Sequence, residues 1–264
     1  MTPTLVFDIE TIPDVAGIRR VYALPATLGD ADVLDWALQQ RRAAAGNDFL
    51  PLHLQRVVAI ACALREAQTF RVWSLGESAD PEPELIRRFF DGIDRYAPQL
   101  VSWNGGGFDL PVLHHRSLIH GVIAPRYWDW GDDDRDYRFN NYLSRFHTRH
   151  LDLMDVLASF QSRACAGLDA MARLCGFPGK LGFDGSQVHA AHQAGRIDDI
   201  RRYCETDVLN THLLYLRFQQ MRGILSAGQY ATELSLAREK IAASNEPHWR
   251  EFLAAWDMSA RSPG

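Results

Sequence analysis

Residues 4–13 read "TLVFDIETIP" and set the starting point for the fold. Residues 4–7 have the composition of a short buried strand, and two acids, Asp8 and Glu10, follow with one isoleucine between them. Side chains two positions apart on an extended chain project to the same face. We therefore expect both carboxylates to stand together at the carboxyl end of a central strand.

Such a pair calls for a positive partner, because adjacent carboxylates repel, raise each other's pKa and lose solvation. Mg²⁺ and Mn²⁺ prefer oxygen ligands and commonly bind one or two carboxylates together with water and phosphate. The alternative is a solvated strand end whose acids only discourage edge pairing. The pair alone does not decide between a metal site and a solvated strand end, since about one Asp-x-Glu is expected by chance in a chain of this composition. A second one, Asp80-Pro-Glu82, precedes a helix that it would cap.

Composition bounds the class of protein. A chain of 264 residues with 47% hydrophobic and 23% charged residues suits one large α/β domain. A net charge of −5 argues against coating nucleic acid through bulk electrostatics, although local recognition stays open. No window approaches the roughly 18 apolar residues of a membrane span, and the N-terminus lacks the basic start of a signal peptide. We expect a soluble, cytoplasmic protein without membrane contact, whose four separated cysteines are buried free thiols.

The periodicity predicts alternating strands and helices. Strands are expected at residues 56–64 and 69–75, joined as a hairpin, and at 98–104. Helices are expected at 81–96 and 108–121, the second ending at a glycine. This order predicts a mixed sheet covered by helices.

The second half of the chain is expected to be mostly helical. Residues 121–149 show no clean period and read as a loop-rich insertion near whatever site the sheet carries. Helices follow at 152–161, 167–175 and 196–222. We divide the chain into a domain of residues 1–222 and a helical, peripheral extension of residues 223–264.

A third acid, Asp109, lies in "SWNGGGFDLP", between a strand and a helix. The three glycines let the backbone approach a ligand closely, and Asp109 falls near the helix N-terminus. Its alternative role is that of a helix cap.

A fourth acid, Asp207, stands one turn after Tyr203 in "RRYCETDVLNTH". The helical register places Asp207 on the inner face with Ile200 and Cys204, where an unpartnered carboxylate is unfavourable. The alternative is a partly exposed Asp207 paired with Arg201 or Arg202.

In this order the three segments resemble the motifs of the DEDD exonuclease superfamily, which has an RNase H-like fold. "FDIET", "NGGGFDLPVL" and "YCETDVLNT" are similar to its first, second and third motifs, the last in the tyrosine version. The resemblance covers roughly residues 4–222. It is to the exonuclease domain of family B DNA polymerases, and most of all to the stand-alone predicted 3′-to-5′ exonucleases related to it.

The resemblance implies an α/β protein with an RNase H-like mixed sheet flanked by helices. It also implies a single catalytic domain that hydrolyses phosphodiester bonds at a 3′ end by a two-metal-ion mechanism. Asp8, Glu10, Asp109 and Asp207 would bind two Mg²⁺ or Mn²⁺ ions, and Tyr203 would position the attacking water. The implied partner is single-stranded DNA or an unpaired 3′ end. RNA stays open because no contact to a 2′-hydroxyl can be identified.

Substrate contacts are expected around the glycine run. Asn104 and the backbone of Gly105, Gly106 and Gly107 would line the terminal nucleotide, while Phe108 either stacks on a base or packs in the core. Five basic residues would either contact substrate phosphates or be merely solvated: Arg145, His147, Arg149, His150 and Lys180.

Asp152 and Asp155 are expected to be cap and surface residues. Two other readings stay open, a non-catalytic nucleic-acid-binding module and a regulatory or scaffolding protein. Protein partners are not readable from the sequence.

Overall fold

The computed structural model describes residues 2–259, which form a five-stranded mixed sheet in the order β3-β2-β1-β4-β5. The strands are β1 (Thr4–Pro13), β2 (Gln55–Glu66), β3 (Thr69–Ser74), β4 (Gln99–Ser102) and β5 (His150–Asp152). β1, β2 and β3 pair antiparallel, whereas β4 and β5 run parallel to β1. The predicted mixed α/β sheet and its β2–β3 hairpin are confirmed. The short strand β5 was not predicted, because three residues are too few to reveal a period.

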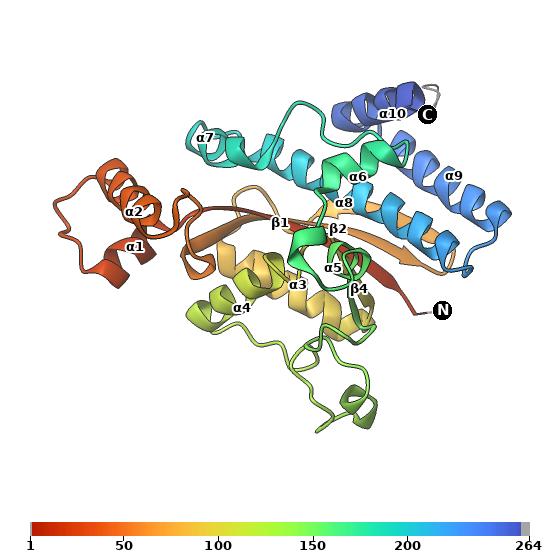
Figure 1. Cartoon of the computed structure of the whole chain (residues 1–264), viewed down its shortest axis with the longest axis horizontal. Coiled ribbons are helices and arrows are strands. Elements are labelled where there is room, and N and C mark those ends of the chain that lie inside the picture. The colour runs from red at the N-terminus through yellow and green to blue at the C-terminus, as the bar shows by residue number, and fades with distance from the viewer. Residues whose placement is uncertain (1, 260–264) are drawn as a thin grey trace.

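Helices cover both faces of the sheet (Figure 1). One face carries α8 (Ile197–Met221) with α6 (Leu168–Leu174) and α9 (Ala227–Ser244), and the other carries α3 (Glu82–Tyr96) and α4 (Asp109–His120). The remaining helices are α5 (Leu153–Leu157), α7 (Val188–Gln193) and α10 (Pro247–Ser259). The apolar residues at helical spacing in α3 are all buried: Leu85, Ile86, Phe89, Phe90 and Ile93.

β1 is longer than predicted, so Asp8 and Glu10 lie within the strand and not at its end. β2 pairs with β1 from Thr4 to Pro13, with a register shift after Glu10, and this pairing keeps the chain extended past the acids. β4 pairs with β1 only from Thr4 to Val6. Beyond Val6, no strand in the described part of the chain pairs with this edge of β1, and the acids lie beside that open edge.

Residues 14–54, to which the sequence analysis assigned no element, form an arm at one end of the sheet (Figure 1). It contains α1 (Val15–Tyr22), α2 (Asp30–Ala45) and the short 3-10 helix η1 (Leu52–Leu54). The arm has a small hydrophobic cluster of its own, separate from the main core and made of Ile18, Val33, Ala37, Leu50 and Leu54.

Residues 121–149 are mostly irregular, with η2 (Arg135–Arg138) as a 3-10 turn. The expectation that this segment lies near the site is wrong. Its Tyr142 hydroxyl donates to the Pro98 carbonyl at 2.7 Å, and Gln99 donates to the Thr148 carbonyl at 2.8 Å. These bonds hold it at the amino end of β4, because its buried tyrosines pack in the core beside α3 and α4.

The C-terminal helices are present as expected, but they are not peripheral. Trp249, Phe252 and Trp256 of α10 and Ala237 of α9 are buried in the same hydrophobic cluster as the inner face of α8. Aromatic residues at helical spacing supply the large apolar area that this face of α8 and the sheet needs to cover. One core therefore extends across the predicted boundary at residue 222.

Candidate active site

Four carboxylates from three separate segments meet beside the open edge of β1. Glu10, Asp109 and Asp207 are each less than a tenth exposed, and Asp8 is half-buried. Burial raises the pKa of Asp8 well above its usual value, and the charges of Asp109, Glu10 and Asp207 raise it further. Burial likewise raises the pKa of Glu10. The four acids predicted from the sequence thus form one electrostatic cluster.

Asp109 fixes its segment to β1. Its Oδ1 accepts a hydrogen bond from the Ile9 amide at 3.0 Å, and this amide lies on the stretch of β1 that β4 does not reach. Phe108, and not Asp109, occupies the N-cap position of α4, without a side-chain capping bond. The capping alternative therefore does not hold. Burial raises the pKa of Asp109 to about 7, although the bond from Ile9 acts in the opposite direction.

Asp207 faces the cluster and not the helix surface. The arginines considered as its alternative partners bind elsewhere, Arg201 to backbone carbonyls of β3 and the turn after it, and Arg202 to Asp199. Its Oδ2 lies 3.3 Å from the ammonium of Lys180. Its Oδ1 is buried without a hydrogen-bond partner among residues 2–259. A buried carboxylate oxygen of this kind suits a cation.

Lys180 and Tyr203 complete the polar surroundings of Asp207. The Lys180 ammonium contacts the Tyr203 hydroxyl as well as Asp207, and it is the one phosphate-contact candidate among the five that lies at the acids. Burial acts to lower the pKa of Lys180, but the negative charges of Asp207, Glu10 and Asp8 outweigh it and raise that pKa. Burial, followed by the charge of Asp207, raises the pKa of Tyr203, so its phenol stays protonated.

The donor set fits a hard divalent cation. Ligand atoms of Asp8, Glu10 and Cys204 lie within 4.8 Å of one another. The buried Cys204 thiol donates to the Asp8 carbonyl at 3.4 Å and to its Oδ2 at 3.5 Å. Burial raises the pKa of Cys204, so the protonated thiol orients Asp8 and the carboxylates supply the ligand oxygens.

The glycine turn after β4 is held by Asp152. Its two carboxylate oxygens each accept a backbone bond at 2.9 Å, one from Asn104 and one from Gly106. Asp152 also caps α5, as expected, but it is buried, so the expectation of a surface residue is wrong. A Cβ at Gly105 would lie 2.3 Å from the Ser102 hydroxyl, so the turn closes this tightly only around glycine.

An aromatic pair joins the arm to the start of α4. Phe108 directly precedes Asp109, and its ring centroid lies 5.8 Å from that of Phe49, which follows α2 in the arm. Phe49 is 53% exposed, whereas Phe108 is half-buried against the α3–α4 core. The sequence analysis missed Phe49, because only the folded arm brings it next to Phe108.

The other four basic candidates do not lie at the acids. Arg145 pairs with Asp155 at 2.6 Å, and Arg149 stacks on Tyr137 within the insertion. The ring of His147 accepts the Asn141 amide. His150 is buried, bonds to the Ser102 hydroxyl at 2.8 Å and has its pKa lowered by burial to about 4. Each of these side chains is held by a neighbouring group, and this contact determines its position.

A comparison with protein families identifies the family of this chain. Residues 47–256 match the family described as "Predicted 3'-5' exonuclease related to the exonuclease domain of PolB". The chain belongs to this family. It therefore carries a 3′-to-5′ exonuclease domain, and its substrate class is nucleic acid. The match includes Asp109, Tyr203 and Asp207 but begins after Asp8 and Glu10, which the fold brings to the other acids.

A curated relative points the same way. The chain is 26% identical over 151 residues to the catalytic subunit of DNA polymerase epsilon from Saccharomyces cerevisiae. The similarity covers 52% of this chain and 6% of that protein. Exonucleases of this kind depend on divalent metal ions, in agreement with the carboxylate cluster. Within residues 2–259, no helix has both the length and the apolar character to cross a lipid bilayer.

Proposed function

We propose that this chain is an active, metal-dependent 3′-to-5′ exonuclease that removes nucleotides from single-stranded DNA or from an unpaired 3′ end. The observation that carries the proposal is the meeting of four carboxylates at one site, where an oxygen of Asp207 has no hydrogen-bond partner within residues 2–259. So many buried carboxylates with raised pKa values are unfavourable in a merely structural role.

Asp8, Glu10, Asp109 and Asp207 would hold two divalent ions, Mg²⁺ or Mn²⁺. Bound there, the ions supply charge for the transition state and lower the pKa of a bound water. The protein residues set the geometry around this chemistry. Asp8 lies between its β1 neighbour Glu10 and the α8 thiol of Cys204, and the bond from Ile9 holds Asp109 at the open edge.

Tyr203 is proposed to orient the attacking water. Its phenol stays protonated and lies one turn before Asp207, so it can donate or accept a hydrogen bond at the place where a nucleophile must be held. Lys180 shares this location. Its ammonium would hold the Tyr203 hydroxyl in place and offset negative charge that develops on the phosphate.

We expect Lys180→Ala to lower kcat about 10- to 100-fold, with a smaller change in KM, because the lost charge acts on the transition state. Lys240→Ala is the matched control, since Lys240 is the other lysine of the chain and lies at the surface of α9. Steady-state kinetics on a labelled oligonucleotide measure both variants. Equal activity of the two variants would remove Lys180 from the proposed mechanism.

The terminal nucleotide would lie against the glycine turn and the aromatic pair. The Asn104 side-chain amide makes no hydrogen bond within residues 2–259 and is free to contact a base or sugar. The small residues Gly105, Gly106 and Gly107 let the substrate approach the backbone closely. Phe108 and the exposed Phe49 would offer ring faces to the last base, and stacking of this kind contributes about 1–3 kcal/mol per base.

Phe49→Ala should raise KM for single-stranded DNA about 5-fold or more while leaving kcat within about 2-fold, because stacking contributes to binding and not to the chemistry. Phe49→Trp should retain the wild-type KM. Phe139→Ala, at an exposed aromatic of the insertion, is the control. An unchanged KM for Phe49→Ala would exclude a contact between Phe49 and the substrate.

The test of the proposed function is degradation of a 5′-labelled single-stranded oligonucleotide with Mg²⁺ or Mn²⁺ and with EDTA. A ladder of products shortened from the 3′ end that vanishes in EDTA supports the proposal, and parallel DNA and RNA substrates assign the sugar. Binding without products in either metal would instead support a non-catalytic nucleic-acid-binding module.

A further inference from the structure

An irregular segment between α6 and α7, residues 176–182, carries Lys180 to the acids. It belongs to no helix or strand, yet Phe177, Pro178 and Gly179 are buried. Buried loops are uncommon, because each of their amides and carbonyls needs a hydrogen-bond partner that secondary structure does not supply. The partners of these groups show what holds Lys180 in place.

Side chains of α8 and α6 bind all four backbone polar groups of Gly179 and Lys180. The Asn210 Oδ1 accepts the Gly179 amide at 3.2 Å, and its Nδ2 donates to the Gly179 carbonyl at 3.0 Å. Asp169 Oδ1 accepts the Lys180 amide at 2.7 Å, and Arg173 donates to the Lys180 carbonyl at 2.8 Å. An ion pair at 2.8 Å joins Asp169 to Arg173. The main chain is thus held on both sides of the Lys180 Cα.

The residue types at Gly179 and Asn210 suit this contact. Gly179 has a φ of +69°, in the left-handed region, and a Cβ there would lie 2.3 Å from Asp169 Oδ1. Asn210 is completely buried, and its Nδ2 also donates to the Thr206 carbonyl at 3.1 Å. A buried amide within a helix is unfavourable unless such bonds satisfy its donors and its oxygen. Asn210 meets this condition only because the segment packs against α8.

The helix α8 holds both ends of Lys180. Tyr203, Asp207 and Asn210 follow one another at spacings of four and three residues, so they share one face of the helix. Asn210 fixes the main chain through Gly179, while Asp207 at 3.3 Å and the Tyr203 hydroxyl contact the ammonium. The four-carbon stem between the two ends is flexible. The ammonium therefore keeps one position only if the main chain is also fixed.

We propose that Asn210 is a positioning residue, which fixes the Lys180 ammonium at the acids. Asp169 contributes to the same contact from α6. The inference rests on the proposed function, in which that ammonium offsets charge on the phosphate. A displacement of about 1 Å lowers the rate of such a site by up to about 100-fold. The Asn210 side chain bonds only to main-chain groups within residues 2–259, so its effect on catalysis passes through Lys180.

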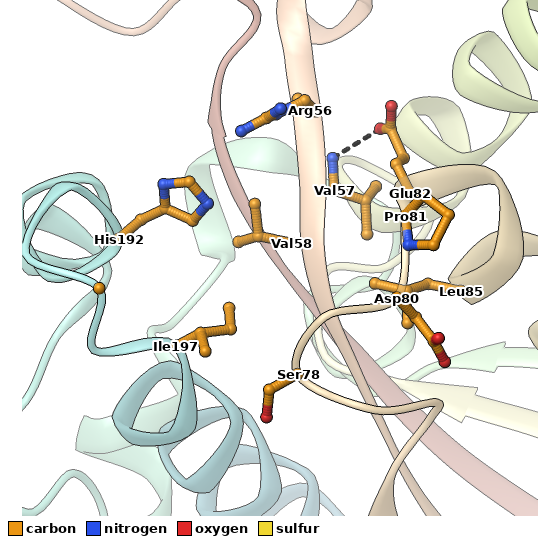
Figure 2. Close-up of a pocket in the computed structure, with 11 residues that line it drawn as sticks. Arg56, Val57, Val58, Ser78, Asp80, Pro81, Glu82, Leu85, His192 and Ile197 are labelled. Atoms are coloured by element: carbon orange, nitrogen blue, oxygen red, sulfur yellow. Dashed lines mark hydrogen bonds between the residues drawn. The ribbon is translucent and has the colours of Figure 1, made fainter.

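Side chains hold backbone amides elsewhere in the fold as well. Glu82 accepts the Val57 amide at 2.7 Å beside a cavity of about 300 Å³ lined by β2, α3 and α7 (Figure 2), and none of the four clustered acids lines that cavity. The buried Asn141 accepts the amides of Leu143 and Ser144 at 3.1 and 3.0 Å in the insertion. Asn141 is the matched control for Asn210, because both are buried asparagines that hold a loop, and the loop of Asn141 lies away from the acids.

The test is a double-mutant cycle on kcat with a labelled single-stranded oligonucleotide. Asn210→Ala should lower kcat about 5-fold and change KM less than about 2-fold, whereas Asn141→Ala should change both less than about 2-fold. In a Lys180→Ala background, Asn210→Ala should lower kcat by less than about a further 2-fold, because the lysine through which it acts is absent. An equal loss in both backgrounds, or in Asn141→Ala, would indicate a general structural role and overturn the proposal.

Asp169→Ala tests the same contact at a more exposed position. The Asp169 side chain is 42% exposed, so this variant should fold even if Asn210→Ala does not, and thermal melts establish the folded state of each variant. It should lower kcat about 3-fold in the wild-type background and leave it unchanged in Lys180→Ala. A loss that persists without Lys180 would contradict the proposed route through the lysine.

A second readout does not depend on activity. The chain has two lysines, Lys180 and Lys240, so ¹³C-dimethylation gives one NMR signal for each, besides that of the terminal amine. The Lys180 nitrogen lies 4.9 Å from the centre of the Tyr203 ring, whose ring current should shift the Lys180 signal. Asn210→Ala should move this signal toward that of the surface Lys240, and Asn141→Ala should not. An unchanged signal in Asn210→Ala would overturn the positioning role.

The NMR signal lets the two proposals fail separately. If the wild type degrades no oligonucleotide while the Lys180 signal depends on Asn210, the exonuclease function fails and the positioning of Lys180 remains. If the wild type degrades oligonucleotides and Asn210→Ala changes neither kcat nor the signal, the positioning role fails and the exonuclease function remains.

Discussion

Asp8→Asn should lower the rate of metal-dependent hydrolysis by about 10³-fold or more, which corresponds to about 4 kcal/mol of lost transition-state stabilisation. Asp8 stands at the centre of the cluster, because the charges of Asp109, Glu10 and Asp207 all act on it. The amide of asparagine keeps the shape of the side chain but removes the charge that binds a cation. Single-turnover hydrolysis of a labelled oligonucleotide measures the loss.

The same substitution should not destabilise the metal-free protein. Removing one of four mutually repelling buried carboxylates relieves repulsion, so the melting temperature in EDTA should equal or exceed that of wild type. Asp136→Asn is the control, at an exposed acid of the insertion. Activity lost together with a large fall in melting temperature would mean that Asp8 has a structural role, and retained activity would exclude it from the site.

Stabilisation by Mg²⁺ should grow steeply as the pH rises from 5 to 8. Burial raises the folded-state pKa of these carboxyls, that of Asp109 to about 7, while the unfolded values lie near 4. The folded, metal-free protein thus binds more protons than the unfolded chain, and its stability falls as the pH rises from about 4 to 7. Metal ions compete with those protons and replace them at the higher pH.

Thermal melts with saturating Mg²⁺ and with EDTA at pH 5 and pH 8 test this expectation. At 100 times Kd the ion contributes about 2.7 kcal/mol, or about 5–10 °C for a chain of this size, at pH 8. At pH 5 the difference should be under about 2 °C, and in Asp8→Asn it should shrink at both pH values. A pH-independent effect of Mg²⁺ in wild type would argue that the ion binds elsewhere.

The local sequence pattern was sufficient to predict much of the site. The alternation along β1 places Asp8 and Glu10 on one face opposite Leu5, Phe7 and Ile9, and the structure retains that alternation. The helical register likewise predicted the inward Asp207, and the order of elements predicted the mixed sheet. These features depend on neighbours within a few positions along the chain, and the period of a strand or a helix fixes them.

Other features depend on contacts between distant segments. The Ile9 amide meets Asp109 across 100 residues, and Cys204 meets Asp8 across 196. The first pair forms where β4 stops and β1 continues, and the second where α8 packs on the sheet, and no local period records either contact. The buried role of Asp152, the approach of Phe49 to Phe108 and the packing of α10 into the core have the same origin.

The sequence by itself determined which residues carry charge and which face of each element they occupy, because both follow from residue type and local periodicity. Only the tertiary structure decided which charges remain unpaired. Of the five basic candidates, it brought Lys180 to the acids and engaged the others locally, and it left Oδ1 of Asp207 without a hydrogen-bond partner among residues 2–259. The physical reason is that pairing depends on distance in space, which is set by how the sheet, the arm and the long helix pack together.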